Sequence, residues 1–469
     1  MTPLDRIAAH VTGAELSDLG AHDRAKARTF LLDTLGVGIA GSSGAGIAAL
    51  VGSVARWGAG EEATVWVTGE RLPAQAAAIV NAYQIHCLEY DCVHEGAVVH
   101  PMATVLSALM AHAERRSAAG RPVPGADFLL AMAIGVDIAT LLGVAAEGPV
   151  RFFRPATAGG FGATAAIARL EGLDETGVKD ALGIMYGQTS GTLQPHAEGS
   201  AVLGLQIGFN ARGALAAVDL AQAGFRGPHA ILDGPYGYFR MFEGDAFDLD
   251  TIWQRLGREW QVSQLAHKPF PSGRLTHGVI DALQRATREL GVDREQIARV
   301  TGHVPPLVHR LVGRPDLPDP EANYAKLCLA YVAGAWLARG QVDVPEFRPP
   351  VLSDPAVHAA AAKVALHLDG NPDQNALAPQ RFVVELADGR RHEVHLAQVY
   401  GHPEVPLTAA ENEDKFRRCV GYASRPLPAE RADALVEAVA AVETLEDASA
   451  LAALTVSAPD MSGRKAMPE

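Results

Sequence analysis

Apolar residues recur at every third or fourth position through most of the first 260 or so residues. This spacing marks one face of an α-helix, which has about 3.6 residues per turn. Gly and Pro separate the periodic segments, as they do at helix ends, and no strand-like alternation persists. The helices expected from this pattern cover residues 23–41, 74–91, 103–120, 126–144, 164–173, 174–188 and 208–225.

The pattern changes after about residue 262. Residues 266–278 (AHKPFPSGRLTHG) predict a loop, and helices follow at 279–290 and 321–340. Short alternating segments predict strands at 298–305, 362–370 and 381–397, the last one turning at Asp388-Gly389, a favoured hairpin pair. We predict a smaller α+β domain here. A helix at 427–443 is expected to return to the large domain, and the tail from about Ser457 is predicted to be disordered.

The most apolar segment, residues 129–146, predicts a buried helix in a large helical core. Asp137 lies in its middle and no basic or aromatic residues flank it, which argues against a membrane span. The first residues show no export signal, so a cytoplasmic location is expected. The net charge is −14 without a long basic run, which argues against nucleic-acid binding but allows a locally basic pocket for an anionic substrate. Four Cys without a CxxC pair predict reduced thiols rather than disulfides or a structural zinc module.

Residues 86–100 (HCLEYDCVHEGAVVH) concentrate groups that bind metals or transfer protons. The pair His94-Glu95 resembles the start of HExxH, but position 98 is Val98, and His100 lies beyond Gly96. We therefore predict no metal here.

An acid–base pocket is the better interpretation of this segment. A helix ending at about Asp91, a loop through Gly96 and a new helix after His100-Pro101 would place Asp91, His94 and His100 on a loop between buried helices. The alternative is that these groups only cap and solvate helix ends.

A second cluster, Lys268, Arg274 and His277, lies in the loop 266–278. Ser272 or Thr276 capping the next helix would add positive potential, and such a loop would suit a carboxylate. The alternative is a domain linker with a solvated basic face.

Two further segments carry isolated polar groups among apolar residues. Residues 151–166 (RFFRPATAGGFGATAA) lack the preceding strand of a dinucleotide fingerprint, so close helix packing explains the glycines, while Arg154 could face a ligand. In residues 202–218, Gln206 and Arg212 are the only strongly polar groups, and we expect them to have a structural role.

The order of several segments resembles the MmgE/PrpD family, which includes 2-methylcitrate dehydratase, cis-aconitate decarboxylase and iminodisuccinate epimerase. The segments are FLLDTLGVGIAGS (30–42), AAAIVNAYQIHCLEYD (76–91) before HP (100–101), GGFGATAAIARLEGL (159–173), GFNARGALAAVDLAQAGFRGPHAILDGPYGYF (208–239), KPFPSGRLTHGVIDAL (268–283), and YGHPEVPLT (400–408) before KF (415–416).

The resemblance implies a mainly α protein with an inserted α+β domain. The expected all-helical domain comprises residues 1–262 and 405–456, the α+β domain residues 263–404, and the disordered tail residues 457–469. It further implies a homodimer and an active site in the cleft between the domains, with no metal or organic cofactor.

The resemblance also assigns site residues. The family's helix end before HP maps onto Glu89, Asp91 and His100, and its K-P-x-P…R-x-T-H loop onto Lys268, Arg274 and His277. This chain has Val93 near the usual Thr, Arg154 where His is common, and Leu203 and Gln206 where Lys and His are often found.

Family reactions remove or add a proton on a carbon next to a carboxylate, which requires offset charge and a base. We expect the catalytic residues to be Asp91, His100, Lys268 and His277, and the substrate-binding residues to be Glu89, His94, Arg154, Gln206 and Arg274. The leading prediction is a 2-methylcitrate dehydratase-like lyase acting on a small di- or tricarboxylate. The alternatives are an epimerase of the iminodisuccinate type, a cis-aconitate decarboxylase-like enzyme, and a non-catalytic carboxylate-binding protein.

Overall fold

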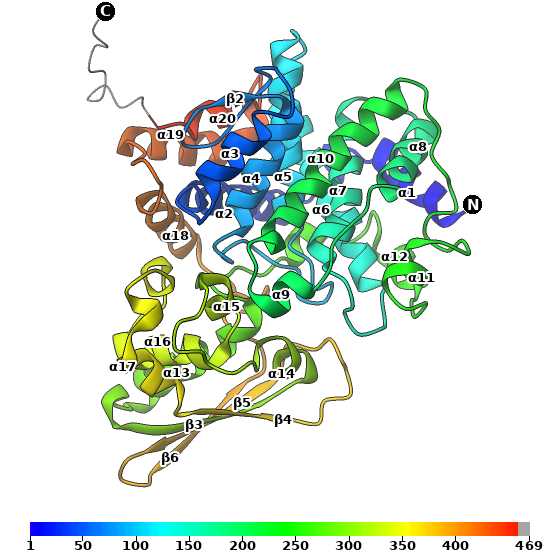
Figure 1. Cartoon of the computed structure of the whole chain (residues 1–469). Helices are drawn as coiled ribbons and strands as arrows, with labels where there is room; N and C mark the ends of the chain where they lie inside the picture. Colours follow the sequence, from blue (N-terminus) through cyan, green and yellow to red (C-terminus); the bar gives the residue numbers. More distant parts are fainter. Residues whose placement is uncertain (458–469) are drawn as a thin grey trace, which may run out of the picture.

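The computed structural model describes residues 1–457 as a helical body above a smaller sheet-containing part (Figure 1). Segments from both ends of the described chain form the helical body. Its helices are α1 (Pro3–Gly13), α2 (Ala21–Gly41), α3 (Ile47–Val54), α4 (Ala74–His86), α5 (Pro101–Ala118), α6 (Gly125–Val144), α7 (Arg154–Leu170), α8 (Glu175–Tyr186), α9 (Gln194–Glu198), α10 (Val202–Gln222), α11 (Tyr238–Phe242), α12 (Leu249–Arg255), α18 (Ala409–Gly421), α19 (Ala429–Ala440) and α20 (Ala450–Leu454).

The sheet-containing part holds a four-stranded mixed sheet in the order β4-β3-β5-β6. Strands β3 and β4 are parallel, whereas β3–β5 and β5–β6 are antiparallel. The elements are α13 (His277–Leu290), β3 (Ile297–Val304), α14 (Pro306–Val312), α15 (Ala322–Lys326), α16 (Leu329–Arg339), α17 (Pro355–Ala361), β4 (Val364–Leu368), β5 (Gln380–Leu386) and β6 (Arg391–Leu396). The predicted strands and the hairpin at Asp388-Gly389 are confirmed.

Two large hydrophobic cores underlie these two parts. One combines residues from Leu4 to Leu265 with Leu327 and with residues of α18, α19 and α20, and the other runs from Val279 to Leu396. We propose that the two cores correspond to the two predicted domains. Leu435 of α19 is fully buried in the first core, which supports the predicted return of the 427–443 segment to the helical body.

Helix α6 is the buried core helix that the sequence predicted. Within residues 1–457 it is the only helix long and apolar enough to cross a membrane, and 89% of its most apolar window is buried inside the protein. One oxygen of Asp137 accepts a hydrogen bond from the Gln261 backbone at 2.7 Å, and the other lies 3.3 Å from His10 Nε2.

The glycines of the 151–166 segment do serve close helix packing. A Cβ on Gly162 of α7 would lie 2.2 Å from the carbonyl oxygen of Gly135 on α6. The two backbones therefore approach more closely than any larger residue would allow.

Several sequence predictions of local structure were wrong. Helix α4 ends at His86 rather than near Asp91, and Glu89 has a left-handed backbone with φ of 53°. A short pair, β1 (Ala63–Thr64) and β2 (Arg71–Leu72), interrupts the first 260 residues. Thr276 occupies the N-cap position of α13, but neither its hydroxyl nor that of Ser272 makes a capping hydrogen bond, because the two hydroxyls lie 2.8 Å from each other and Thr276 donates to the Gly273 carbonyl. Of the predicted tail, Ser457 is ordered against Pro426, and residues 458–469 lie outside the described residues.

Candidate active site

The site is built on the loop that joins α4 to α5. His100 occupies the N-cap position of α5 and Pro101 its first turn, as predicted. The backbone of Val93 pairs with that of Ala266 through hydrogen bonds of 3.0 and 2.7 Å. This bridge brings the loop 87–100 against the loop 266–278, so the two candidate segments of the sequence meet in space.

Asp91 and Glu89 form the centre of a buried charge cluster. Both Asp91 oxygens lie 3.1 Å from His86 Nδ1, and Oδ2 lies 3.3 Å from His100 Nδ1. Lys268 Nζ lies 2.8 Å from a Glu89 oxygen and 3.8 Å from Asp91. Four predicted residues, Glu89, Asp91, His100 and Lys268, are therefore brought together, and His86 joins them.

The cluster balances its own charges. Burial opposes a charge on His86, but Asp91 and Glu89 outweigh it and raise the pKa of this imidazole to about 9. Burial likewise opposes ionisation of Asp91, but His86 and His100 hold its pKa below its usual range. Against burial, Lys268 and His86 keep the pKa of Glu89 well below its usual range. Two cations, His86 and Lys268, thus face two carboxylates.

His100 is the group of this cluster best placed for proton transfer. Its Nδ1 lies 3.0 Å from the Cys92 carbonyl oxygen, which can only accept a hydrogen bond, so Nδ1 carries the proton. Burial and the nearby Lys268 lower the pKa of His100, so the ring is neutral and Nε2 keeps its lone pair. The arrangement leaves a base nitrogen available to a substrate.

His86, Asp91 and His100 also offer three ligand atoms within 4.8 Å of one another, which could hold a metal ion. Lys268 already brings a positive charge to within 3.8 Å of Asp91. In addition, His100 Nδ1 donates to the Cys92 carbonyl, so only Nε2 of this ring is free to ligate. The donor set therefore suits proton transfer better than metal binding.

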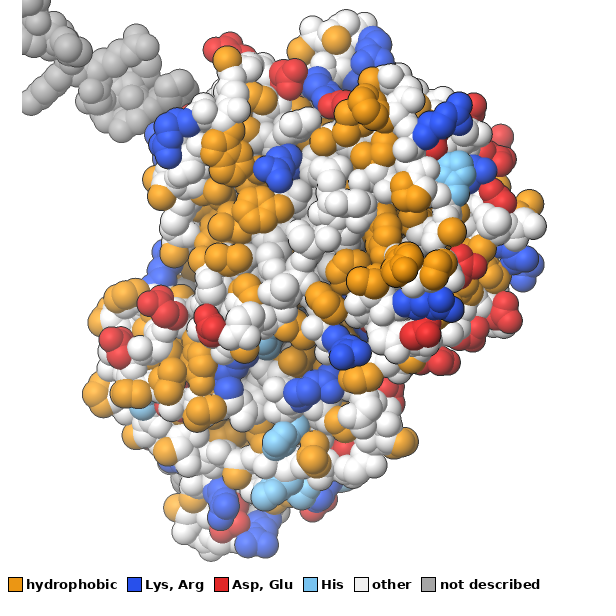
Figure 2. All heavy atoms as spheres, turned by 45° about the vertical axis from the view of Figure 1, so that its right-hand side comes forward, with side chains coloured by type: hydrophobic (Ala, Val, Ile, Leu, Met, Phe, Trp, Pro, Cys, Tyr) orange, Lys and Arg blue, Asp and Glu red, His pale blue; other side chains and the backbone are white. Residues whose placement is uncertain are grey.

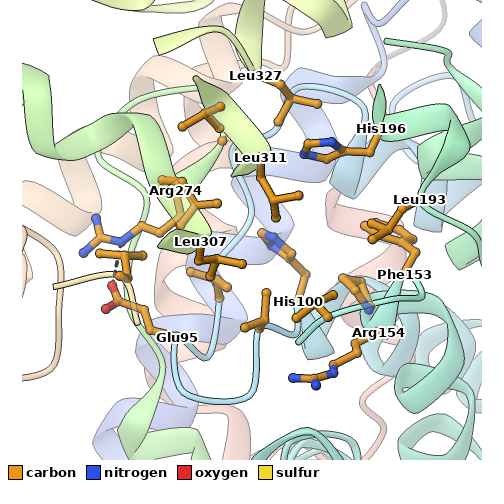
Figure 3. A pocket seen from close by; sticks show the side chains of 18 of the residues that line it. Glu95, His100, Phe153, Arg154, Leu193, His196, Arg274, Leu307, Leu311 and Leu327 are labelled. Atoms are coloured by element: carbon orange, nitrogen blue, oxygen red, sulfur yellow. Dashed lines mark hydrogen bonds and ion pairs between the residues drawn. The ribbon is translucent and has the colours of Figure 1, made fainter. Parts of the chain in front are cut away.

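A small cavity of about 80 Å³ lies beside the cluster (Figure 3). Glu89 and His100 reach it from the helical body, and Arg274 reaches it from the loop before α13. Its walls are mainly apolar and include six leucines: Leu193, Leu275, Leu307, Leu311, Leu327 and Leu377.

Two predicted arginine ligands line this cavity but are already paired. Arg274 bonds Glu95 at 2.7 Å and donates to the Val399 and Tyr400 carbonyls. Arg154 is 1% exposed; it bonds Glu243 at 2.7 Å and donates to two carbonyls. Their guanidinium groups therefore hold the walls together, and their role as substrate ligands stays a prediction.

The remaining predicted site residues do not join the cluster. His277 has Nε2 3.2 Å from the Ser272 carbonyl and Nδ1 3.4 Å from Arg274, so both ring nitrogens face its own loop. His94 bonds Gln261 and the Ala97 amide. Gln206 accepts a hydrogen bond from the backbone amide of Thr192 and donates one to its carbonyl.

Sequence reasoning missed His86, Glu95 and His196 of this site. His86 belongs to the quoted segment 86–100, but the expected helix to Asp91 hid its contact with Asp91. The ion pair of Glu95 with Arg274 could not be predicted from the sequence, because the two residues are 179 positions apart along the chain. His196 of α9 lines the cavity and stands in a segment, QPHAE, without any recognisable motif.

Comparison with known proteins gives matches over nearly the whole chain. Residues 5–250 match the MmgE/PrpD N-terminal domain, and residues 270–441 match the MmgE/PrpD C-terminal domain.

Curated relatives agree with these domain matches. Human cis-aconitate decarboxylase is 30% identical over 446 residues, which cover 92% of this chain and 89% of the human protein. The cis-aconitate decarboxylase-like protein oryM of Aspergillus oryzae is 30% identical over 463 residues, 95% of each chain. The mouse cis-aconitate decarboxylase is 29% identical over 448 residues, covering 92% of this chain and 88% of the mouse protein. The resemblance seen in the sequence is confirmed: the chain belongs to the MmgE/PrpD family.

Proposed function

We propose that this chain is a carboxy-lyase acting on a small unsaturated carboxylate, in the manner of the cis-aconitate decarboxylases that it resembles. The observation that carries the proposal is His100, a neutral imidazole with a free Nε2 at an apolar cavity. Relatives that match 92% and 95% of the chain support the same reaction.

The apolar walls favour loss of CO2. Cleavage of the carbon–carboxylate bond turns a localised charge into neutral CO2 and an electron pair spread over the neighbouring double bond. A carboxylate held against leucines loses part of its hydration, which raises the free energy of the bound substrate. The transition state is affected less, because its charge is more dispersed and needs less hydration. Nε2 of His100 first takes a proton from solvent and then delivers it to the carbon that receives the electron pair, which returns the ring to its neutral form.

The leading sequence prediction, a 2-methylcitrate dehydratase-like lyase, remains an alternative on the same site. In that reaction His100 would remove the α-proton, and a second group would protonate the leaving hydroxyl. An epimerase of the iminodisuccinate type would need a second base on the opposite face of the carbon. The comparisons favour the decarboxylase alternative, because two cis-aconitate decarboxylases each match 92% of the chain.

A substrate panel in D2O separates these activities. The panel contains cis-aconitate, 2-methylcitrate, citrate and iminodisuccinate, each followed by NMR and by CO2 release. We expect CO2 together with deuterium on one carbon of the product. A new alkene without CO2 would show a dehydratase, and exchange without either would show an epimerase. Thermal stabilisation by a panel member without any exchange would show a non-catalytic binder and contradict the proposal.

A further inference from the structure

The proposed reaction requires a hydrogen-bond donor that no residue assigned so far supplies. Negative charge builds up on a substrate carboxylate as CO2 or a proton leaves, and it must be stabilised there. The three predicted cations are each held by a carboxylate: Lys268 by Glu89, Arg274 by Glu95 and Arg154 by Glu243. A donor with no such partner is therefore needed at the cavity wall.

His196 fits this requirement. It lies on the short helix α9, is half-buried and lines the same cavity as His100. Figure 3 shows the two imidazoles at the cavity, one from the loop before α5 and the other from α9. Glu89 of the charge cluster lines this cavity as well, so His196 and the cluster border the same space.

Arg314 fixes the proton of His196 on one nitrogen. Arg314 Nη2 lies 3.0 Å from His196 Nδ1. A guanidinium only donates hydrogen bonds, so Nδ1 must accept. Burial and then the charge of Arg314 lower the pKa of His196 to about 4, which keeps the ring neutral. A neutral ring that accepts at Nδ1 carries its proton on Nε2.

Arg314 is itself held in place without a carboxylate. It donates to the Leu311 carbonyl at 3.1 Å and stacks over Tyr324 at 4.9 Å from the ring centre. Within residues 1–457 no carboxylate lies within ion-pair distance of it, and its buried Nη1 has no hydrogen-bond partner. Its charge is therefore left to act on His196 and the cavity.

The contact between α9 and α15 keeps this pair together. A Cβ on Gly199, where φ is 75°, would lie 2.7 Å from the Tyr324 backbone nitrogen. Only glycine allows this approach, which brings the end of α9 against the residue that stacks on Arg314.

We propose that His196 is a catalytic hydrogen-bond donor, whose Nε2–H binds the substrate oxygen on which negative charge develops, and that Arg314 is the residue that positions it. The two histidines then act as a complementary pair, because His100 takes up and delivers a proton at Nε2, whereas His196 keeps its proton and presents an N–H. A neutral imidazole donor is effective in such a role because its acidity is closer to that of the developing enolate than an imidazolium's would be. This inference rests on the proposed function for its reaction, but the tautomer of His196 is independent of it.

The tautomer is tested by NMR on the full chain labelled with 15N-histidine. We expect the His196 proton on Nε2 at pH 7, and a shift of this proton when the unreactive analogue propane-1,2,3-tricarboxylate is added. In Arg314→Gln we expect a mixture of tautomers, whereas Arg310→Gln, an exposed arginine on α14, leaves the signal unchanged. A proton on Nδ1 in the unsubstituted protein, or an Nε2–H that ignores the analogue, would overturn the inference.

Kinetics test the catalytic role. In His196→Leu we expect kcat to fall about 10²-fold with KM nearly unchanged, because the bond strengthens mainly in the transition state. His196→Gln keeps an N–H donor and should recover part of this loss, while His395→Gln, an exposed control on β6, should have no effect. An unchanged kcat in His196→Leu, or a loss in KM alone, would overturn the role. If the unsubstituted protein turns over no panel member, the proposed function fails, and the NMR response to the analogue still decides whether His196 binds a carboxylate.

Discussion

His100 has one nitrogen committed to the protein and the other free. Its Nδ1 faces both the Cys92 carbonyl and Asp91, so the ring cannot turn without breaking two contacts. We predict that His100→Ala lowers kcat at least 10²-fold, because general acid–base catalysis contributes about that much or more.

Folding should survive this substitution, because Asp91 keeps its contact with His86 and its ion pair with Lys268. Circular dichroism and the thermal midpoint should stay close to those of the unsubstituted protein. His395→Ala serves as the control on an exposed strand. Normal turnover in His100→Ala would remove this residue from the mechanism.

Lys268 stabilises the fold as well as the site. It is fully buried, 2.8 Å from a Glu89 oxygen, and also donates to the Glu89 backbone. Lys268→Met removes one partner of a buried ion pair, so we predict a loss of about 3–5 kcal/mol in the free energy of unfolding. Urea unfolding measures this loss.

The matched experiment is the double variant Lys268→Met/Glu89→Gln, which removes both charges. It should recover part of the stability but none of the activity, because the two residues are energetically coupled. Equal stability of Lys268→Met and the unsubstituted protein would show that the pair contributes nothing to folding.

The sequence allowed prediction of most residues that join the buried charge cluster, but not of which residues hold the predicted arginine ligands. The segment 86–100 and the loop 266–278 both carried visible chemistry, and Glu89, Asp91, His100 and Lys268 do meet. Arg274 and Arg154 looked equally available, yet Glu95 and Glu243 hold them. A local pattern indicates which groups exist and which face is buried, whereas a contact 89 or 179 residues away along the chain depends on the tertiary fold.

At the scale of elements, the end of α4 shows how an apolar pattern can mislead. Leu88 and Tyr90 continue the apolar spacing of α4, but both lie in a separate small core that also contains Val344. All of residues 87–94 are buried, so this loop also carries apolar side chains. The apolar pattern therefore continues past the end of the helix. Long periodic segments such as α6 and the alternating strands β5 and β6 were predictable, because each buries one consistent face or is buried throughout.

The contact between α6 and α7 offers a test of close helix packing in the body. We predict that Gly162→Ala lowers the free energy of unfolding by roughly 1–3 kcal/mol, because its Cβ would meet the Gly135 carbonyl at 2.2 Å. Gly52→Ala on α3 is the control, since a Cβ there meets nothing within 4 Å and a small gain is expected. Urea unfolding of both variants decides the point; equal stabilities would mean that the helices separate at no cost.

At the scale of the whole molecule, exposed apolar side chains bear on assembly. On the face shown in Figure 2, apolar side chains gather over the helical body. Exposed large residues of the chain include Val202 and Leu220 on α10, Phe225 after it and Met241 on α11. We keep the homodimer implied by the resemblance as a proposal, because exposed apolar groups of this kind often mark an interface.

Buried histidines make the stability of the whole chain depend on pH, because the fold lowers the pKa of some of them and raises that of another. Burial, with smaller effects from neighbouring charges, lowers the pKa of His94 and His196 to about 4 and that of His267 to about 3. In the unfolded chain these groups bind protons near pH 6.5. Between pH 6.5 and about 4 the unfolded state therefore binds more protons, and acid favours unfolding.

His86 has the opposite effect on the alkaline side. Its folded-state pKa of about 9 means that the native protein holds a proton which the unfolded chain loses near pH 6.5, so stability falls as the pH rises from 6.5 to 9. We predict that the free energy of unfolding is greatest near pH 6.5, with each histidine contributing up to about 1.4 kcal/mol per pH unit within its window. Urea midpoints at pH 5, 6.5 and 8.5 test this profile. His86→Gln should remove the alkaline decline and keep the acid one, because His94, His196 and His267 remain; an alkaline decline that persists in this variant would mean that His86 is neutral in the folded protein.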